Sequence, residues 1–330
     1  TISWRASFIL QVLIVVLIMV LSRRIADPGV QGARPKFDLV GTILSAAGLV
    51  FVVLGILQAG TYGWVTANQN FTIGNTVVIP QGGISPVWLF VGIGALLLVG
   101  FFVWIRSRER AGKEPLLHTR MFRNRASNRA LVTQLIQWFI MQGSFFVISV
   151  YLQEVHGYNA IQTGLSLTPT TIGILIAGAL AGRLAQRRTQ KRLIWVGFVL
   201  TIAGMILLLL LAGLTSSSLA SIPGLLLIGL GVGTMLTSSV NVVQSSFPDK
   251  DQGEISGLSR SVSNLGASLG TAIAGSVLVT TLVAPEKTYP LAFITMIVFA
   301  CIGLIAAILI PSDQVKSGTV RETPETAEKA

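Results

Sequence analysis

The sequence predicts an all-α integral membrane protein, a bundle of several transmembrane helices, and three properties indicate this fold class. Of its 330 residues, 52% are hydrophobic and only 11% are charged. The mean hydropathy is +0.74. Apolar runs long enough to cross a bilayer recur along the chain. A soluble domain carries about 25% charged residues, so a chain of this composition could not cover its surface with polar groups in water.

The apolar runs define about nine candidate spans, because a transmembrane helix needs about 20 mostly apolar residues. The first run lacks the basic region and the cleavage site of a signal peptide, so it is predicted to be a genuine span. The spans are expected near residues 4–22, 39–60, 87–105, 130–152, 162–182, 193–213, 222–245, 255–283 and 289–311.

Polar segments separate these spans. Basic cytoplasmic linkers are expected at 23–38 and 107–129, and an uncharged outer loop at 61–86. The β-branched runs on either side of Gly74-Asn75 favour a small hairpin in that outer loop. Residues 312–330 contain Pro, Thr and Glu without apolar periodicity, so they are predicted to form a disordered cytoplasmic tail.

The distribution of positive charge predicts the orientation of the spans. The chain carries 24 Lys and Arg against 13 Asp and Glu. Almost all of the Lys and Arg fall in loops on one side, whereas only Arg5 and Lys287 fall on the other, and Arg260 lies within a span. Because these residues concentrate in cytoplasmic loops, the amino end is expected outside the cell membrane and the carboxyl end inside. Charge spread over alternate loops, without a recognisable nucleic-acid-binding motif, argues against a nucleic-acid partner.

Residues that commonly perform catalysis or bind metals are scarce. His118 and His156 are the only histidines and fall on opposite sides of the predicted membrane, so they cannot share a metal. Cys301 is the only cysteine, which excludes a disulfide framework. The acids lie in loops, at span ends or in the tail. We therefore predict that the chain is not an enzyme and holds no metal or cofactor.

Four pairs of glycines occur at the GxxxG spacing that places two small residues on one helix face. Small residues let helices approach closely where lipid provides no hydrophobic drive to association. The pairs predict a tight bundle and do not by themselves indicate transport. They are Gly178 and Gly182, Gly229 and Gly233, Gly253 and Gly257, and Gly266 and Gly270.

Neutral polar residues form stripes on three of the expected spans. Uncompensated amides and hydroxyls are costly in hydrocarbon, so these stripes should face protein or a water-filled cavity. Hydrogen bonding between helices and the lining of a central polar path both remain open. The stripes are Gln134, Gln137, Met141, Phe145 and Ser149; Thr234, Thr237, Asn241 and Gln244; and Arg260, Ser263, Asn264 and Thr271.

Several segments together resemble the major facilitator superfamily of transporters. "SWRASFILQVLIVVLIMVLSRR" looks like its sixth span, and "YLQEVHGYNAIQTGLSLTP" is the most specific match, to the turn joining spans seven and eight. "PDKDQGEISGLSRSVSNLGASLGTAIAGSVL" resembles the glycine-rich eleventh span. Residues 39–106 resemble two extra central helices, and the run "GKEPLLHTRMFRNRASNRALV" resembles the linker into the second half. The order and spacing are similar to those of the fourteen-span drug:H⁺ antiporters, the multidrug efflux type.

This resemblance implies the sixth span at 1–22, the two central helices at 39–106 and a complete second six-helix half at 130–311. The first five spans, with their proton-coupling acids, are expected to be absent, and a full carrier would need them. Glu154 is the nearest coupling candidate here, although a solvated helix end is the simpler interpretation. Superfamily carriers bind substrate between two halves that rock about the site. The implied cavity face comprises Gln134, Gln137, Trp138, Met141, Phe145 and Asn241.

The basic run "GRLAQRRTQKR" resembles the second-half copy of the superfamily signature Gly-x-Leu-x-Asp-Arg-x-Gly-Arg-Arg, a loop that latches the cytoplasmic face. Gln186 stands where the acid is expected, and Thr189 where the turn glycine is expected. A role as a helix end that only fixes topology remains open beside a gating role. The gating residues implied by the resemblance are Gly182, Arg187, Arg188, Lys191 and Arg192.

The sequence therefore predicts transmembrane transport, namely proton-coupled efflux of amphipathic drugs or related small molecules by alternating access. The expected partners are a small-molecule substrate, protons and the lipid bilayer, and the expected location is the cell membrane. Two alternatives stay open: export of an endogenous metabolite, and a membrane interaction or regulatory fragment that does not transport.

Overall fold

The computed structural model describes residues 5–23, 38–74, 76–187, 189–214, 218–248, 251–280 and 285–310. The chain divides into two units, Thr1–Phe37 and Asp38–Ala330. The first unit contains one described helix, α1 (Arg5–Ser22), whose stretch from Phe8 to Ser22 is apolar. The apolar side chains along that stretch suit contact with lipid.

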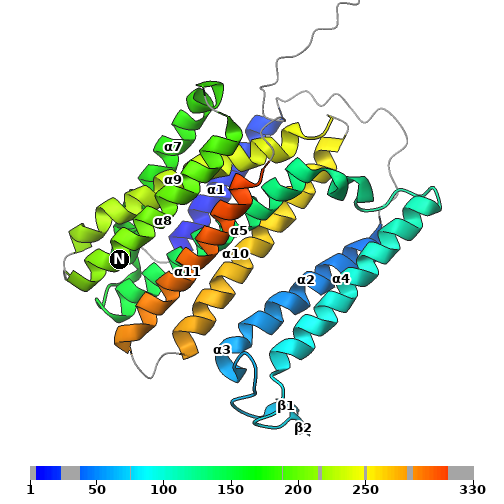
Figure 1. Ribbon diagram of the computed structural model, residues 1–330, viewed down its shortest axis with the longest axis horizontal. Helices are drawn as coiled ribbons and strands as arrows, with labels where there is room; N and C mark the ends of the chain where they lie inside the picture. The colour runs from blue at the N-terminus through cyan, green and yellow to red at the C-terminus, as the bar shows by residue number, and fades with distance from the viewer. Residues whose placement is uncertain are drawn as a thin grey trace, which may run out of the picture. The chain divides into compact units, whose positions relative to one another are not determined.

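The second unit is almost entirely helical (Figure 1). Eight described helices, some joined across a short break, are long and apolar enough to cross a membrane. The predicted fold class of a multi-span helical bundle is thereby confirmed. Its elements are α2 (Leu39–Leu57), α3 (Ala59–Tyr62), α4 (Pro86–Arg110), the 3₁₀ helix η1 (Thr119–Arg123), α5 (Arg125–Glu154), α6 (Ala160–Ser166), α7 (Thr168–Arg187), α8 (Gln190–Leu214), η2 (Ser218–Ser221), α9 (Ile222–Ser245), α10 (Gln252–Thr280) and α11 (Pro285–Ile308).

Polar capping residues determine where several helices begin. Ser85 accepts a hydrogen bond from the backbone N–H of Val87, directly ahead of Pro86 at the first position of α4. Asn124 accepts hydrogen bonds from the first turn of α5, and Asn159 forms a reciprocal capping box with Gln162 at the start of α6. Such caps satisfy backbone N–H groups that have no partner within the helix.

The loop between α3 and α4 forms the expected hairpin. Strands β1 (Phe71–Ile73) and β2 (Thr76–Ile79) pair antiparallel, with Ile73 opposite Thr76. Gly74 adopts φ +62°, a left-handed conformation that glycine reaches without strain. The two flanking β-branched runs and a turn glycine were sufficient to predict this element.

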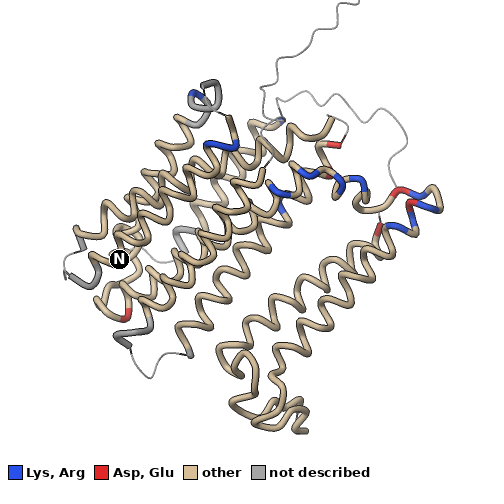
Figure 2. Tube along the Cα trace, in the orientation of Figure 1, with Lys and Arg blue, Asp and Glu red and all other residues tan. Residues whose placement is uncertain are grey.

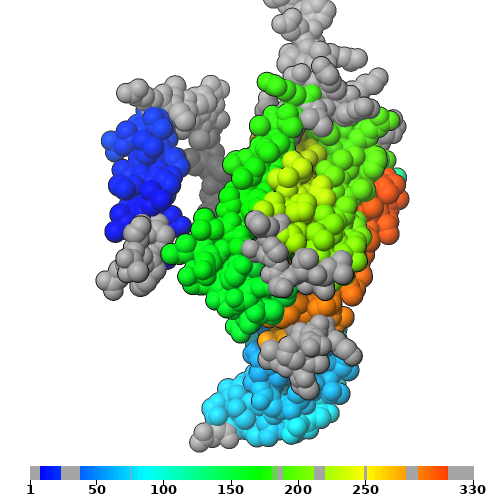
Figure 3. All heavy atoms as spheres, turned by 90° about the vertical axis from the view of Figure 1, so that its left-hand side faces the viewer, coloured from blue at the N-terminus to red at the C-terminus, as the bar shows by residue number. Residues whose placement is uncertain are grey.

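Helix α5 lies at the centre of the second unit and packs against α9, α10 and α11, while α9 also packs against α7 and α8. Figure 3 shows α9 between α7 and α8 on one face. Helix α2 pairs with α4, and α10 contacts α2 and α3. Gly48 of α2 and Gly94 of α4 face each other so closely that an added Cβ at either would meet the backbone oxygen of the other, a close approach typical of membrane helices.

The charged residues of the second unit are distributed asymmetrically. Figure 2 shows the described Lys and Arg gathered toward the end of the helices opposite the β1–β2 hairpin. The loop from Thr61 to Pro86 that contains the hairpin carries no charged residue. We refer below to the charged end as the basic end.

Candidate functional site

Gln134 of α5 lies in a hydrogen-bonded contact between two helices. Its side chain is 2% exposed. The Nε2 atom donates to the hydroxyls of Ser259 and Ser263 of α10 at 2.9 and 3.0 Å, and Oε1 accepts from Ser259 at 3.0 Å. All the polar atoms of this amide are satisfied by α10, so in this conformation Gln134 fastens α5 to α10.

Gln137, one turn further along α5, is less completely paired. It is 1% exposed, and its Oε1 accepts a hydrogen bond of 3.0 Å from Ser239 of α9. Its Nε2 atom is buried and has no hydrogen-bond partner among the described residues, and the same holds for the hydroxyls of Ser144 and Ser238. Buried donors without partners are uncommon, and an ordered water, a functional contact or a change of conformation can supply the missing partner.

The remaining members of the expected cavity face are less deeply placed. Trp138, Met141 and Phe145 are half-buried on α5, and Asn241 is exposed on α9. Met141 packs against the hydrophobic core. The structure therefore brings the two glutamines into helix contacts and leaves Asn241 on an open face.

Seven of the eight paired glycines have described surroundings, and these are of two kinds. Added Cβ atoms at Gly229 and Gly233 would meet α7, at the backbone oxygens of Thr170 and Ile174. Those at Gly266 and Gly270 would meet α5, at the backbone oxygens of Leu135 and Phe139. By contrast, a Cβ would meet no described atom within 4 Å at Gly178, Gly253 and Gly257. Helix packing was expected at these three positions, and among the described residues no neighbouring helix approaches them.

The predicted gating residues fall largely outside the described part of the chain. Helix α7 ends at Arg187 and α8 begins at Gln190. Arg188 and the side chains of Gly182 and Arg187 lie outside the described residues. Lys191 is half-buried and Arg192 exposed in the first turn of α8, so the gating role of this block stays a prediction.

Asp38, directly ahead of α2, is a buried polar junction at the basic end. Its carboxylate accepts hydrogen bonds from the indole N–H of Trp104 (3.0 Å) and from the backbone N–H groups of Gly41 (3.0 Å) and Leu116 (3.2 Å), and it lies 3.6 Å from Arg108. Burial acts to raise the pKa of Asp38, but these hydrogen bonds and the Arg108 charge together hold its pKa below the ordinary value of 3.8.

The linker between α4 and α5 is fastened to both of its neighbours. The backbone N–H and the hydroxyl of Thr119 each donate a 2.6 Å hydrogen bond to Glu109 of α4. Nδ1 of His118 lies 2.5 Å from Glu254 of α10, and Arg120 forms a 2.7 Å ion pair with Asp251 just ahead of α10. This set of contacts, which we call the linker clasp, connects the α2–α4 pair to α10 at the basic end.

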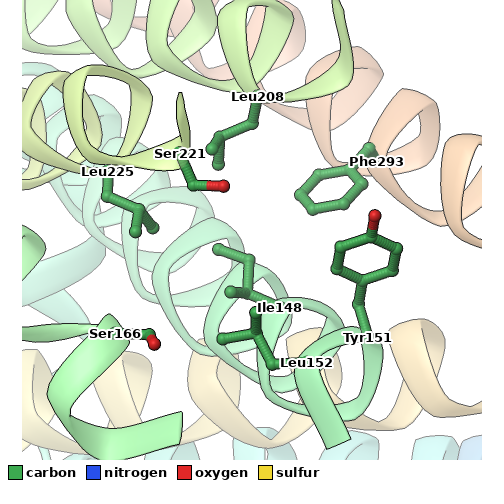
Figure 4. Close-up of a pocket in the computed structure, with 8 residues that line it drawn as sticks. All are labelled: Ile148, Tyr151, Leu152, Ser166, Leu208, Ser221, Leu225 and Phe293. Atoms are coloured by element: carbon green, nitrogen blue, oxygen red, sulfur yellow. The ribbon is translucent and has the colours of Figure 1, made fainter. Parts of the chain in front are cut away.

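Two cavities of the second unit are lined by side chains from several helices. The larger, about 580 Å³, lies between α2, α4, the linker and α10; its walls are mainly apolar, and Glu254 is its single charged lining residue. The smaller, about 30 Å³, has room for about one water molecule. Figure 4 shows the lining side chains of the smaller cavity converging from several helices, among them Ile148, Tyr151, Leu225 and Phe293. None of the six residues of the expected cavity face lines either cavity.

The described residues contain no candidate metal site, because no three His, Cys, Asp or Glu side chains lie close enough together to hold an ion. His118 and Glu254 form only a pair.

Comparison with known protein families identifies the family of this chain. Residues 39–271 match the family described as Major Facilitator Superfamily, and this match covers more than half of the sequence. The chain belongs to the major facilitator superfamily. Helices α5 to α11 of this superfamily chain supply the six spans that were expected between residues 130 and 311.

Curated relatives of this superfamily chain bear names that refer to transport or drug resistance. The probable actinorhodin transporter of Streptomyces coelicolor is 25% identical over 83% of this chain and 45% of the relative. The tetracenomycin C resistance and export protein of Streptomyces glaucescens is 29% identical over 83% and 47%. The multidrug resistance protein Stp of Mycobacterium tuberculosis is 26% identical over 84% and 47%. These names are in keeping with a transporter family and not with an enzyme, as predicted.

The chain spans about half the length of the curated relatives it matches.

The superfamily resemblance did not single out the residues of the linker clasp as a site. Glu254 of the clasp was expected from the sequence only in a loop or at a span end, and His118 only on one side of the predicted membrane. His118 and Glu254 lie 136 positions apart in the sequence. No local sequence pattern could therefore have identified this pair.

Proposed function

We propose that this chain forms part of the membrane-embedded body of an exporter that moves amphipathic small molecules across the cell membrane by alternating access. The observation that carries this proposal is the match, over more than four-fifths of the chain, to proteins named as exporters and resistance proteins of antibiotics and drugs. A polytopic helical bundle is the architecture that such transport requires.

The buried polar face of α5 supports a substrate contact on this bundle. Gln137 retains an unpaired Nε2 atom, and the hydroxyls of Ser144 and Ser238 are likewise buried without partners. Movement of α5 against α9 would bring these donors to a substrate or to water. Trp138, Met141 and Phe145 lie on the same helix, and soft aromatic and thioether side chains adapt to ligands of different shape. Gln134 and Asn241 complete the proposed cavity face.

Proton coupling is part of the proposal, and it is assigned to no acid of this chain. Among the described helices, every Asp and Glu lies in the first or last turn, as Glu109, Glu154 and Glu254 illustrate. An acid at a helix end is more accessible to water than one in the membrane interior, where intramembrane proton relays are found. We place coupling in a further segment of a fourteen-span antiporter and the gate at Arg187, Arg188, Lys191 and Arg192.

The orientation in the proposal follows from the basic end, which is assigned to the cytoplasm. Single cysteines introduced at Gly82 and at Lys113, in a Cys301→Ser background, test it in intact cells. A thiol reagent that cannot cross the membrane should label the Gly82 position and not the Lys113 position. The reverse labelling would invert the proposed topology.

Transport is tested in cells that express the reading frame containing this chain. Accumulation of ethidium, a lipophilic cationic dye, and of a neutral lipophilic dye is compared with cells lacking the gene, with and without a protonophore. Lower accumulation that the protonophore restores supports proton-coupled efflux. Equal accumulation of both dyes in expressing and non-expressing cells would contradict export of amphipathic drugs, and efflux of a cell's own metabolites alone would favour the metabolite exporter.

A further inference from the structure

Helix α4 presents an apolar stripe that is largely exposed within the second unit. The stripe follows the three- and four-residue spacing of one helix face, and at the basic end it continues into Arg106. Val99 is 60% exposed and Val103 is 64% exposed. The exposed apolar members are Trp88, Leu89, Leu96, Val99, Phe102 and Val103. In a membrane such a face is in contact with lipid chains.

The ends of this stripe match the thickness of a bilayer. A helix rises about 1.5 Å per residue, so Trp88 and Arg106 lie about 27 Å apart along α4, close to the hydrocarbon thickness of about 30 Å. Trp88 is exposed and its indole N–H donates to the backbone oxygen of Trp64 at 2.8 Å. Tryptophan is enriched at the membrane–water interface. With Trp88 at one interface, Arg106 lies at the level of the headgroups of the opposite leaflet.

A groove of about 440 Å³ opens beside Arg106. Its floor includes Phe102 and Phe122, whose ring centroids lie 5.2 Å apart. Arg106 and Arg123 line it and are both exposed. Neither forms an ion pair within 4 Å among the described residues, although the charge of Arg123 helps to lower the pKa of Glu109. The groove therefore offers two guanidinium groups above an apolar wall formed by Val99 and Val103, and its lining includes no acid.

The two arginines come from different segments that are held together. Arg106 belongs to α4, whereas Arg123 ends η1. The two hydrogen bonds from Thr119 to Glu109 fasten η1 to the last turn of α4, and the Arg120–Asp251 ion pair fastens it to the start of α10. The fold thus fixes the positions of the two backbone segments that carry these arginines.

We propose that this groove binds the phosphate headgroup of an anionic phospholipid from the leaflet at the basic end, with an acyl chain lying along Val99 and Val103. Guanidinium groups form strong, charge-assisted hydrogen bonds to phosphate oxygens, and basic pockets at the ends of membrane helices suit anionic headgroups. The apolar wall continuous with the groove favours a lipid over a soluble phosphate. Lipid binding in this groove is independent of which substrate the protein transports.

The test measures lipid binding to the full chain purified in detergent. Native mass spectrometry reports the ratio of lipid-bound to free protein during titration with phosphatidylglycerol or phosphatidylcholine. Each cation near an anionic surface contributes about fivefold to affinity. Arg106→Gln and Arg123→Gln should each weaken phosphatidylglycerol binding about fivefold, and the double variant roughly 25-fold, while phosphatidylcholine binding changes little. The matched control is Arg110→Gln with Lys113→Gln, which removes the same charge from exposed positions outside the groove.

Two outcomes would overturn the proposal. The first is an equal loss of phosphatidylglycerol binding in the groove variant and in the control variant, which would indicate general attraction to the basic end. The second is complete displacement of the lipid by inorganic phosphate, which would indicate an anion site without a lipid contact. Thermal unfolding in the same detergent checks that each variant is folded, and the single variants carry the test if the double variant unfolds.

Discussion

The indole N–H of Trp104 donates a 3.0 Å hydrogen bond to Oδ1 of Asp38, which joins the last part of α4 to the residue that caps α2. The same carboxylate also holds the linker through Leu116. Asp38 is 3% exposed, so its charge is stabilised by these donors and by Arg108 in place of water. One side chain therefore connects two membrane helices and the linker between α4 and α5.

We expect Asp38→Asn to lower the free energy of unfolding by about 1–3 kcal/mol, because an amide oxygen accepts weaker hydrogen bonds than a carboxylate and leaves Arg108 without its charge partner. Chemical unfolding in detergent, followed by tryptophan fluorescence, measures the change. Glu114→Gln is the matched control, since Glu114 is exposed on the same linker. Equal stabilities of the two variants would show that the Asp38 contacts contribute nothing.

Asp38 also predicts a dependence of stability on pH. Its pKa in the folded chain lies below the ordinary value of 3.8. Its stabilising contribution is therefore fully present above that value and is lost as the pH falls through the lower, folded pKa. The difference in unfolding free energy between the wild type and Asp38→Asn should be constant from about pH 7 to pH 5 and should shrink toward pH 3. A difference that grows on acidification would contradict the assigned direction.

Gln134 and Asn241 were both expected on the substrate cavity, and the structure predicts different outcomes for them. Gln134→Ala removes the amide that bonds Ser259 and Ser263, so it should destabilise the fold by about 1–2 kcal/mol. Asn241→Ala alters an exposed side chain and should leave stability unchanged within about 0.5 kcal/mol.

The two variants are compared by thermal unfolding and by dye efflux. The proposed cavity requires Asn241→Ala to change the relative efflux of different dyes at a normal protein level. Efflux that stays the same for every dye removes Asn241 from the site. A Gln134→Ala variant as stable as the wild type would show that its hydrogen bonds to α10 are dispensable.

The sequence was sufficient for the helices and the hairpin because their signals are local. Apolar runs of membrane-spanning length predicted α9 at its observed bounds and α5 with its start five residues late. The β-branched runs that flank Gly74 predicted the β1–β2 hairpin. Contacts between helices were harder to predict from the sequence. GxxxG spacing places Gly253 and Gly257 on one face of α10 but does not say whether another helix covers that face. The contact of Gly48 with Gly94 has no such spacing, since each glycine lies on a different helix.

The glycines of α10 provide a matched pair for testing close helix packing. Gly270→Ala should destabilise the bundle by about 1–3 kcal/mol, because its methyl group would overlap the backbone oxygen of Phe139 and a backbone atom cannot move aside as a flexible side chain can. Gly257→Ala, on the same helix, meets no described atom within 4 Å. Since alanine favours helix more than glycine does, Gly257→Ala should keep or raise stability, by up to about 1 kcal/mol. Thermal unfolding of both variants in one detergent measures the difference, and an equal loss of stability in both would mean that α10 tolerates a methyl group no better on its open face than against α5.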